Sequence, residues 1–238
     1  MKKTIGIIGG MGPEGTADLY MKIIRYYQQK FNAKYDKDFP EFFISSIPIP
    51  DVVESLENEK ITLTMLTETA IKLQNAQCDF IVIACNTVQY LLNDIKKSIT
   101  VPIIDIAKVI ALYLNKKRYK KVSILATSAT LEKKVYDNEI DNVGIEVIKP
   151  NNKDQKIVTK VIMTQLAGKT TKEETNMLIQ VINNLKNQGA EAVLIACTDL
   201  PMVINQKDTK IKLIECTQIY ANQAAFISFS SKQVNSFV

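Results

Sequence analysis

An internal repeat of short apolar segments constrains the fold of this 238-residue chain more than any other feature. Three segments of the first half resemble three of the second half, in the same order: 3–9 with 120–126, 79–85 with 191–197, and 102–105 with 212–215. The separations drift only from 117 to 110 residues, as loop insertions would cause. Buried parallel strands resemble one another in general, but the shared order favours a unit of about 110 residues that occurs twice.

Apolar runs of strand length alternate with amphipathic segments at helical spacing throughout the chain. We predict strands at 5–8, 41–47, 80–84, 101–104, 122–126, 145–148, 193–196 and 211–214, and helices at 14–30, 59–77, 88–97, 107–116, 129–141, 153–167, 172–187 and 217–228. This alternation is typical of parallel sheets with helices on both faces. We therefore expect an α/β protein with two similar parallel-sheet domains, related by a pseudo-twofold axis, and an active site in the cleft between them. The first domain would comprise 1–104 plus 215–238, and the second 105–214.

Composition excludes several kinds of chemistry. The chain has no histidine, which rules out Ser-His-Asp and Cys-His catalysis and histidine-ligated metals. Its net charge of +5 comes mainly from scattered lysines, so we predict no nucleic-acid partner. The apolar run near the N-terminus is too short for a signal peptide or a membrane span, which predicts a cytoplasmic protein with no membrane partner. In that compartment the four cysteines would be free thiols.

Two of these cysteines occupy equivalent positions in the repeat. Cys85 and Cys197 each directly follow an apolar strand, at the end where parallel sheets collect ligands. If the two halves face each other, the thiols flank one carbon atom, so that one removes a proton and the other returns a proton to the opposite face. We expect helix N-termini to lower the thiol pKa for this task. Cys78 and Cys216 have no counterpart in the other half, so we assign them to packing.

Hydrogen-bonding residues follow both thiols: Asn86 and Thr87 after the first, Thr198 and Asp199 after the second. Such side chains, with nearby backbone amides, suit a carboxylate ligand. Asp105 and Glu215 follow equivalent strands as well, and we interpret both as helix caps. The cysteines lie too far apart in sequence for a zinc motif, so we predict no metal site.

A glycine-rich loop at residues 10–15 matches the pattern G-x-G-x-x-G between a strand and a helix. That pattern occurs in dinucleotide-binding proteins, but the acidic residue expected at the end of the next strand is missing. We interpret the loop as a tight turn whose backbone approaches a small substrate, with Pro13 at the start of the helix.

The motifs together resemble the aspartate/glutamate racemase family, in particular the aspartate racemases that need no pyridoxal phosphate. The resemblance covers residues 3 to about 225 and rests on five motifs: Ile7 to Pro13, Ala84 to Thr87, Pro102 to Asp105, Cys197 to Pro201 and Glu215 to Thr217. It implies a cofactor-independent amino-acid racemase, usually a homodimer, with Cys85 and Cys197 as the catalytic pair. The implied contacts of the substrate's α-carboxylate and amino group are Gly10, Met11, Asn86, Thr87 and Thr198, and Val52 and Asp199 are further candidates.

The chain departs from the family pattern at three positions. Gln89 stands where relatives often carry histidine, and Val52 stands where aspartate-specific members carry an arginine that pairs with the substrate's side chain. A family lysine aligns near Leu166, with Lys169 three residues further on. We therefore expect the substrate to be aspartate or a related amino acid, and the apolar Val52 would suit a less acidic side chain. Two alternatives stay open: a racemase of hydantoins or other acids, and a nonenzymatic binding protein for a small ligand.

Overall fold

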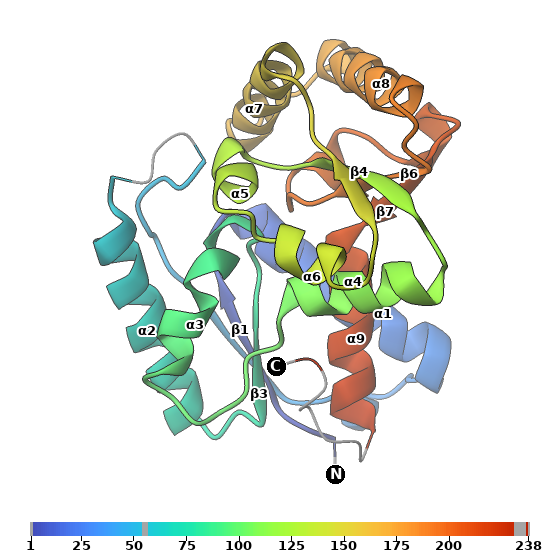
Figure 1. Cartoon of the computed structure of the whole chain (residues 1–238). Helices are drawn as coiled ribbons and strands as arrows, with labels where there is room; N and C mark the ends of the chain where they lie inside the picture. Colours follow the sequence, from blue (N-terminus) through green and yellow to red (C-terminus); the bar gives the residue numbers. More distant parts are fainter. Residues whose placement is uncertain (1, 54–56, 231–236, 238) are drawn as a thin grey trace.

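A computed structural model of the chain describes residues 2–53, 57–230 and 237 (Figure 1). The first sheet is parallel, with strand order β2-β1-β3. It comprises β1 (Ile5–Gly9), β2 (Phe42–Ser46) and β3 (Phe80–Ile83). Its register places Ile7 of β1 opposite Ile44 of β2 and Val82 of β3. The connections contain α1 (Pro13–Phe31), the 3-10 turn η1 (Asp36–Asp38) and α2 (Glu59–Asn75).

The second sheet repeats this topology with one more strand. It is parallel, with strand order β5-β4-β6-β7, and comprises β4 (Lys121–Leu125), β5 (Glu146–Ile148), β6 (Ala192–Ile195) and β7 (Lys212–Glu215). Its helices are α5 (Ser128–Glu132), α6 (Asp137–Asp141), α7 (Asn152–Leu166) and α8 (Lys172–Asn187), with 3-10 turns η3 (Leu200–Met202) and η4 (Gln206–Asp208). The prediction of two similar parallel α/β units is thus confirmed, whereas the pseudo-twofold axis and the domain boundaries stay predictions.

One hydrophobic core joins the two sheets. Alternate strand residues such as Ile7 and Val82 of the first sheet, and Ile124 and Leu194 of the second, belong to a single buried cluster. The helices α1, α4 (Ile106–Lys116) and α9 (Cys216–Phe229) fill the space between the sheets, and α9 packs against both of the others (Figure 1). Each such buried side chain contributes roughly 1.5–3 kcal/mol of transfer free energy.

The outer face of each sheet has a core of its own. Ile81 and Ile83 of β3 pack with Leu66 of α2, and Val193 and Ile195 of β6 pack with residues of α7 and α8. Strand residues therefore alternate between two buried faces, which explains why the strands are apolar throughout. This sandwich fixes the carboxyl ends of the strands, where the candidate site residues lie.

Three predicted elements are wrong in detail. Residues 101–104 form no strand but a single parallel bridge between Ile81 and Ile103, because Pro102 lacks the N–H that a ladder needs. The helix predicted at 88–97 is a 3-10 turn, η2 (Thr87–Leu91), followed by the short α3 (Leu92–Lys96). The helix predicted at 129–141 is two short helices, α5 and α6, interrupted where Lys134 adopts a φ of 52°.

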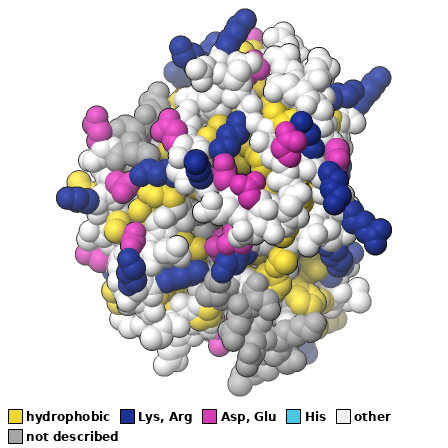
Figure 2. Space-filling view, in the orientation of Figure 1, with side chains coloured by type: hydrophobic (Ala, Val, Ile, Leu, Met, Phe, Trp, Pro, Cys, Tyr) yellow, Lys and Arg dark blue, Asp and Glu magenta, His cyan; other side chains and the backbone are white. Residues whose placement is uncertain are grey.

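Figure 2 shows lysine and arginine side chains spread over the visible face among acidic ones, rather than gathered in one patch. Among the helices of the described residues, none is both long and apolar enough to cross a bilayer.

Candidate active site

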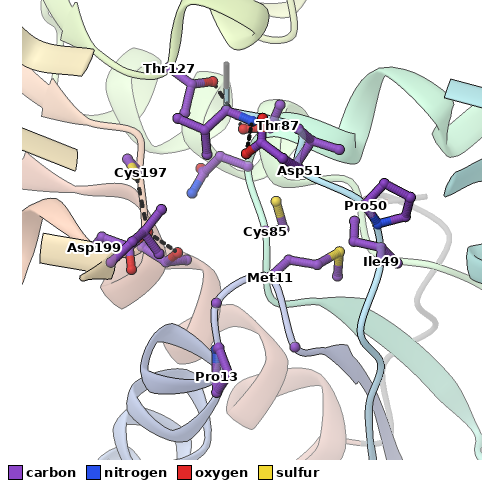
Figure 3. Close-up of a pocket in the computed structure, with 17 residues that line it drawn as sticks. Met11, Pro13, Ile49, Pro50, Asp51, Cys85, Thr87, Thr127, Cys197 and Asp199 are labelled. Atoms are coloured by element: carbon purple, nitrogen blue, oxygen red, sulfur yellow. Dashed lines mark hydrogen bonds between the residues drawn. The ribbon is translucent and has the colours of Figure 1, made fainter. Parts of the chain in front are cut away.

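Every residue that the sequence singled out for catalysis or substrate binding lies on one cavity of about 230 Å³. The cavity lies where the segments after β1, β3 and β6 meet (Figure 3). The predicted residues that line it are Gly10, Met11, Val52, Cys85, Asn86, Thr87, Cys197, Thr198 and Asp199. The structure thus brings together segments that are far apart in the sequence, although it does not test the role of each residue.

Cys85 follows β3 and its side chain is buried, with 6% of the residue exposed. Burial raises the pKa of the Cys85 thiol to about 11, because a thiolate loses hydration there. Hydrogen bonds from the backbone N–H groups of Val88 and Thr87 act in the opposite direction but do not offset the burial. The expectation of a lowered thiol pKa is therefore wrong, because burial outweighs the effect of these N–H groups.

Cys197 follows β6 and has a different electrostatic environment. Its thiol donates a hydrogen bond to Oδ2 of Asp199 at 3.5 Å. Burial, and then the negative charge of Asp199, raise the pKa of Cys197 well above its ordinary value. Burial also raises the pKa of the Asp199 carboxyl group. Asp199 also raises the pKa of Cys85, but there its charge acts less than the burial and the two backbone N–H groups do.

Asn86 supplies a buried hydrogen-bond donor at the cavity wall. Its Oδ1 accepts a hydrogen bond from the hydroxyl group of Tyr136, a residue only 1% exposed at the start of α6. Its Nδ2 is buried and has no partner within the part of the chain that the structure describes. The Tyr136 contact thus fixes the amide with its N–H groups available. Sequence reasoning missed Tyr136, since it lies inside a segment predicted as continuous helix.

A cluster of threonine hydroxyl groups connects the two repeated units beside the cavity. The hydroxyl oxygen of Thr127 lies 3.0 Å from that of Thr87 and 2.8 Å from that of Thr130, and Thr130 reaches Thr87 at 3.3 Å (Figure 3 shows the first contact). Thr127 lines the cavity and was not predicted. The internal repeat could have identified it, because Thr127 lies 117 residues after Gly10, the separation between the repeated segments 3–9 and 120–126.

The glycine loop forms the tight turn that the sequence predicted. Gly10 has a φ of 98°, and a Cβ at this position would lie 2.3 Å from the carbonyl oxygen of Ile47. The helix α1 starts at Pro13, and a Cβ on Gly15 would lie 2.6 Å from the Cβ of Thr198. The lack of side chains therefore lets the start of α1 approach the segment that follows Cys197.

The remaining wall is largely apolar. Val52 is 8% exposed, and Leu166 at the end of α7 also lines the cavity, whereas Lys169 does not. Gln89 is buried, and its Nε2 donates to the carbonyl oxygens of Cys85 at 3.3 Å and of Ile83 at 3.4 Å. Gln89 therefore supports the backbone that carries the first thiol.

The two acidic residues at equivalent strand ends differ in role. Asp105 caps α4, because its Oδ1 accepts hydrogen bonds from the backbone N–H of Ala107 at 2.8 Å and of Lys108 at 3.3 Å. Glu215 makes no such bond to α9 but forms an ion pair with Lys22 at 2.6 Å, so its prediction as a cap is wrong. Cys78 and Cys216 are buried and do not line the cavity, in agreement with a packing role. The described residues contain no group of three or more His, Cys, Asp or Glu side chains arranged to hold a metal ion.

Comparison with known proteins identifies the family. The model of the Asp/Glu/Hydantoin racemase family matches residues 8–224. The chain is 26% identical over 229 residues to the broad specificity amino-acid racemase RacX of Bacillus subtilis (strain 168), covering 95% of this chain and all of the relative. The chain therefore belongs to the Asp/Glu/hydantoin racemase family, as its motifs predicted, and it is an isomerase of the racemase class.

Solved structures support the same assignment. An aspartate racemase homologue from Pyrococcus horikoshii OT3 superposes with a TM-score of 0.81 at 28% identity, over 97% of this chain and 100% of that one. The aspartate racemase of Picrophilus torridus gives a TM-score of 0.80 at 27% identity, over 94% of each chain.

Proposed function

We propose that this protein racemises an α-amino acid without a cofactor, by proton transfer between Cys85 and Cys197. The observation that carries the proposal is the pair of buried thiols, each two residues beyond the end of the corresponding strand of a repeated unit and both on one cavity. A negative charge on Cys85 would raise the pKa of Cys197, which supports the two thiols being close enough to act on one substrate.

In this mechanism one cysteine starts as thiolate and the other as thiol. The thiolate takes the proton from the α-carbon, and the electron pair left on that carbon is delocalised into the α-carboxylate. The opposite thiol then gives its proton to the other face of the planar carbon. The product is the other enantiomer, and the two sulfurs have exchanged protonation states.

A high thiol pKa makes the corresponding thiolate a stronger base, as this chemistry requires. A base of pKa about 11 binds a proton more strongly than an ordinary thiolate, and an α-carbon gives up its proton reluctantly. The positive α-ammonium group of a bound amino acid favours the thiolate electrostatically, since opposite charges nearby stabilise the ionised form. Substrate binding would thus lower the pKa of the thiol that acts as the base.

The polar wall provides partners for both ends of the amino acid's backbone. The free N–H of Asn86, with Thr87, Thr198 and the amides near Gly10 and Met11, would hold the α-carboxylate. Asp199, the carboxylate beside Cys197, would receive the α-ammonium group. We also propose the domain division at 104/105 and 214/215, and a homodimer as the active form.

A single panel tests this function. L-amino acids of every side-chain class are incubated with the purified protein in D₂O without added cofactor, and NMR follows the α-proton signal while chiral chromatography follows the D-enantiomer. We expect loss of the α-proton together with appearance of the D-form for at least one amino acid. If no amino acid exchanges its α-proton, while binding to one is detected by calorimetry, the protein is a small-ligand-binding protein instead. Exchange of hydantoins alone would point to the other alternative.

A further inference from the structure

The charged groups around the cavity are unequal in sign. Among the described residues that line it there are two carboxylates, Asp51 and Asp199, and no lysine or arginine. The rest of the lining is apolar or carries neutral hydroxyl, amide and thiol groups. A side-chain carboxylate of a substrate would therefore enter a partly buried space without a cationic partner, which is costly.

Most of the apolar lining lies apart from Asp199. In Figure 3, Met11, Ile49 and Pro50 gather on the side of Cys85, and Cys197 and Asp199 lie on the opposite side. Val52 adds another aliphatic side chain to the lining. Leu166 lies at the other end, near Asp199, because a Cβ on Gly12 would be 3.2 Å from Cδ2 of Leu166 and 3.8 Å from Oδ1 of Asp199. With Asp199 and the amide of Asn86 assigned to the substrate's backbone groups, this aliphatic wall is left for its side chain.

Asp51 adds a negative charge next to that wall. It is exposed, it lines the cavity, and its Oδ1 accepts a hydrogen bond from the backbone N–H of Val53 at 3.0 Å. This turn fixes the direction of the carboxylate group. A negative charge held here repels an acidic side chain and attracts one that ends in a cation.

We propose, on the basis of the racemase function above, that the substrate is an amino acid whose aliphatic side chain is uncharged or ends in a cation, and that acidic amino acids are disfavoured. This selection is electrostatic. Asp51 supplies a negative charge, and positions 52 and 166 carry the apolar Val52 and Leu166, so that no cation is present among the described lining residues.

The first test compares kcat/KM for L-aspartate, L-glutamate, L-leucine and L-lysine, measured by α-proton exchange in D₂O at one ionic strength. We expect leucine or lysine to exceed both acidic amino acids by on the order of tenfold or more, which corresponds to about 1.4 kcal/mol. Faster exchange of aspartate or glutamate overturns this inference and leaves the racemase function intact. If no amino acid exchanges, the racemase function itself is wrong.

Two substitutions test the electrostatic cause. Leu166→Lys introduces a cation at the C-terminal end of α7, where the helix dipole favours it, and Leu166 is 42% exposed, so the change is tolerable for folding. Its matched control is Leu166→Gln, which is also polar but uncharged. We expect the aspartate-to-leucine ratio of kcat/KM to rise on the order of tenfold in Leu166→Lys relative to Leu166→Gln. Equal ratios in the two variants contradict the proposal.

Asp51→Asn removes the charge while Oδ1 keeps its role in the turn. We expect the aspartate-to-leucine ratio to rise and the lysine-to-leucine ratio to fall, a divergence that a purely structural effect would not produce. Asp38→Asn is the control, because Asp38 also accepts backbone N–H bonds, from Lys34 and Tyr35, but does not line the cavity. Ratios that stay at the wild-type values in Asp51→Asn contradict the proposal.

Discussion

The amide group of Asn86 depends on a residue from the other repeated unit. Tyr136 donates its hydroxyl hydrogen to Oδ1 of Asn86, and Nδ2 of the same amide has no partner among the described residues, so its N–H groups are available to a substrate. Both side chains are almost fully buried, so bulk water does not compete for this hydrogen bond. The orientation of a proposed substrate donor is thus fixed by a neighbour that does not line the cavity itself.

Tyr136→Phe should therefore weaken substrate binding. Without the phenol hydroxyl the amide can rotate, and we expect KM to rise about fivefold, as for the loss of roughly 1 kcal/mol, with a smaller change in kcat. Steady-state kinetics measure the split. The matched control is Tyr27→Phe, since the Tyr27 hydroxyl is also buried but bonds the hydroxyl of Ser228 at 2.9 Å, away from the cavity. An equal KM in wild type and Tyr136→Phe would refute the positioning role.

The raised thiol pKa values predict a pH dependence. Burial raises the pKa of Cys85 to about 11 and raises that of Cys197 well above its ordinary value, so only a small fraction of either thiol is ionised at pH 7. The ionised fraction grows about tenfold per pH unit below the pKa. We expect kcat/KM to rise with a slope near one between pH 6 and 8.5. A plateau already reached below pH 7.5 would show a thiol pKa far lower than burial allows.

For individual residues, the sequence predicted those that occupy equivalent positions in the repeat. It did not predict residues that reach the site only through tertiary packing. Cys85 and Cys197 could be predicted because each follows an apolar strand at the same place in its unit. Tyr136 could not, because its contact with Asn86 joins segments 50 residues apart through the fold. The pKa direction of the thiols was also beyond the sequence, since it depends on how completely they are buried.

Among the elements, the start of α1 depends on close backbone approach. A Cβ on Gly15 would lie 2.6 Å from the Cβ and 2.7 Å from the hydroxyl oxygen of Thr198, closer than real contacts allow. Thr198 itself is buried and lines the cavity. The helix and the segment after β6 therefore cannot keep their present separation with a larger residue here.

Gly15→Ala should reduce activity, although alanine has the higher helix propensity. Alanine favours the helix by roughly 0.4–1 kcal/mol, but overpacking against Thr198 costs about 1–3 kcal/mol and shifts a cavity residue. We expect kcat/KM to fall at least tenfold, with a net loss of thermal stability by calorimetry. Glu68→Ala, on the exposed side of α2, is the control. Wild-type activity in Gly15→Ala would mean that Thr198 has no part in binding.

Most elements could be predicted because apolar strands and amphipathic helices have distinct periods. The wrong predictions share a cause. The hydrophobic pattern runs on without a break in these segments, but the backbone conformation of one residue ends the helix or strand there. Pro102 limits a strand to one bridge, and the left-handed conformation of Lys134 separates α5 from α6. The residues after Cys85 form a tight 3-10 turn, so the first thiol is not followed by the long helix that the sequence suggested.

For the whole molecule, the repeat has a direct counterpart in topology. The order β2-β1-β3 matches the order β5-β4-β6, and the bridge at Ile103 lies beside β3 as β7 lies beside β6. The sequence alone predicted this duplication. It did not predict that one core, built on α1, α4 and α9, joins both sheets, because the pattern of a buried strand does not tell which helix covers each face.

The family resemblance predicts a homodimer. Light scattering after size-exclusion chromatography should give twice the 26.8 kDa mass of the chain at micromolar concentration. Racemase activity per chain should then fall on dilution below the dissociation constant if the active form is the dimer. A mass of one chain with full activity would contradict this prediction.

The central claim is that Cys85 and Cys197 together invert the α-carbon, and single cysteine variants test it most directly. Racemisation of the best substrate is followed in D₂O for Cys85→Ser and Cys197→Ser, with Cys78→Ser, another buried cysteine outside the cavity, as the matched control. We predict that each of the first two variants folds like the wild type by circular dichroism and loses racemisation by a factor of about 10² to 10⁴. The control should keep its activity. Full racemisation by a folded Cys85→Ser or Cys197→Ser protein would contradict the two-thiol mechanism.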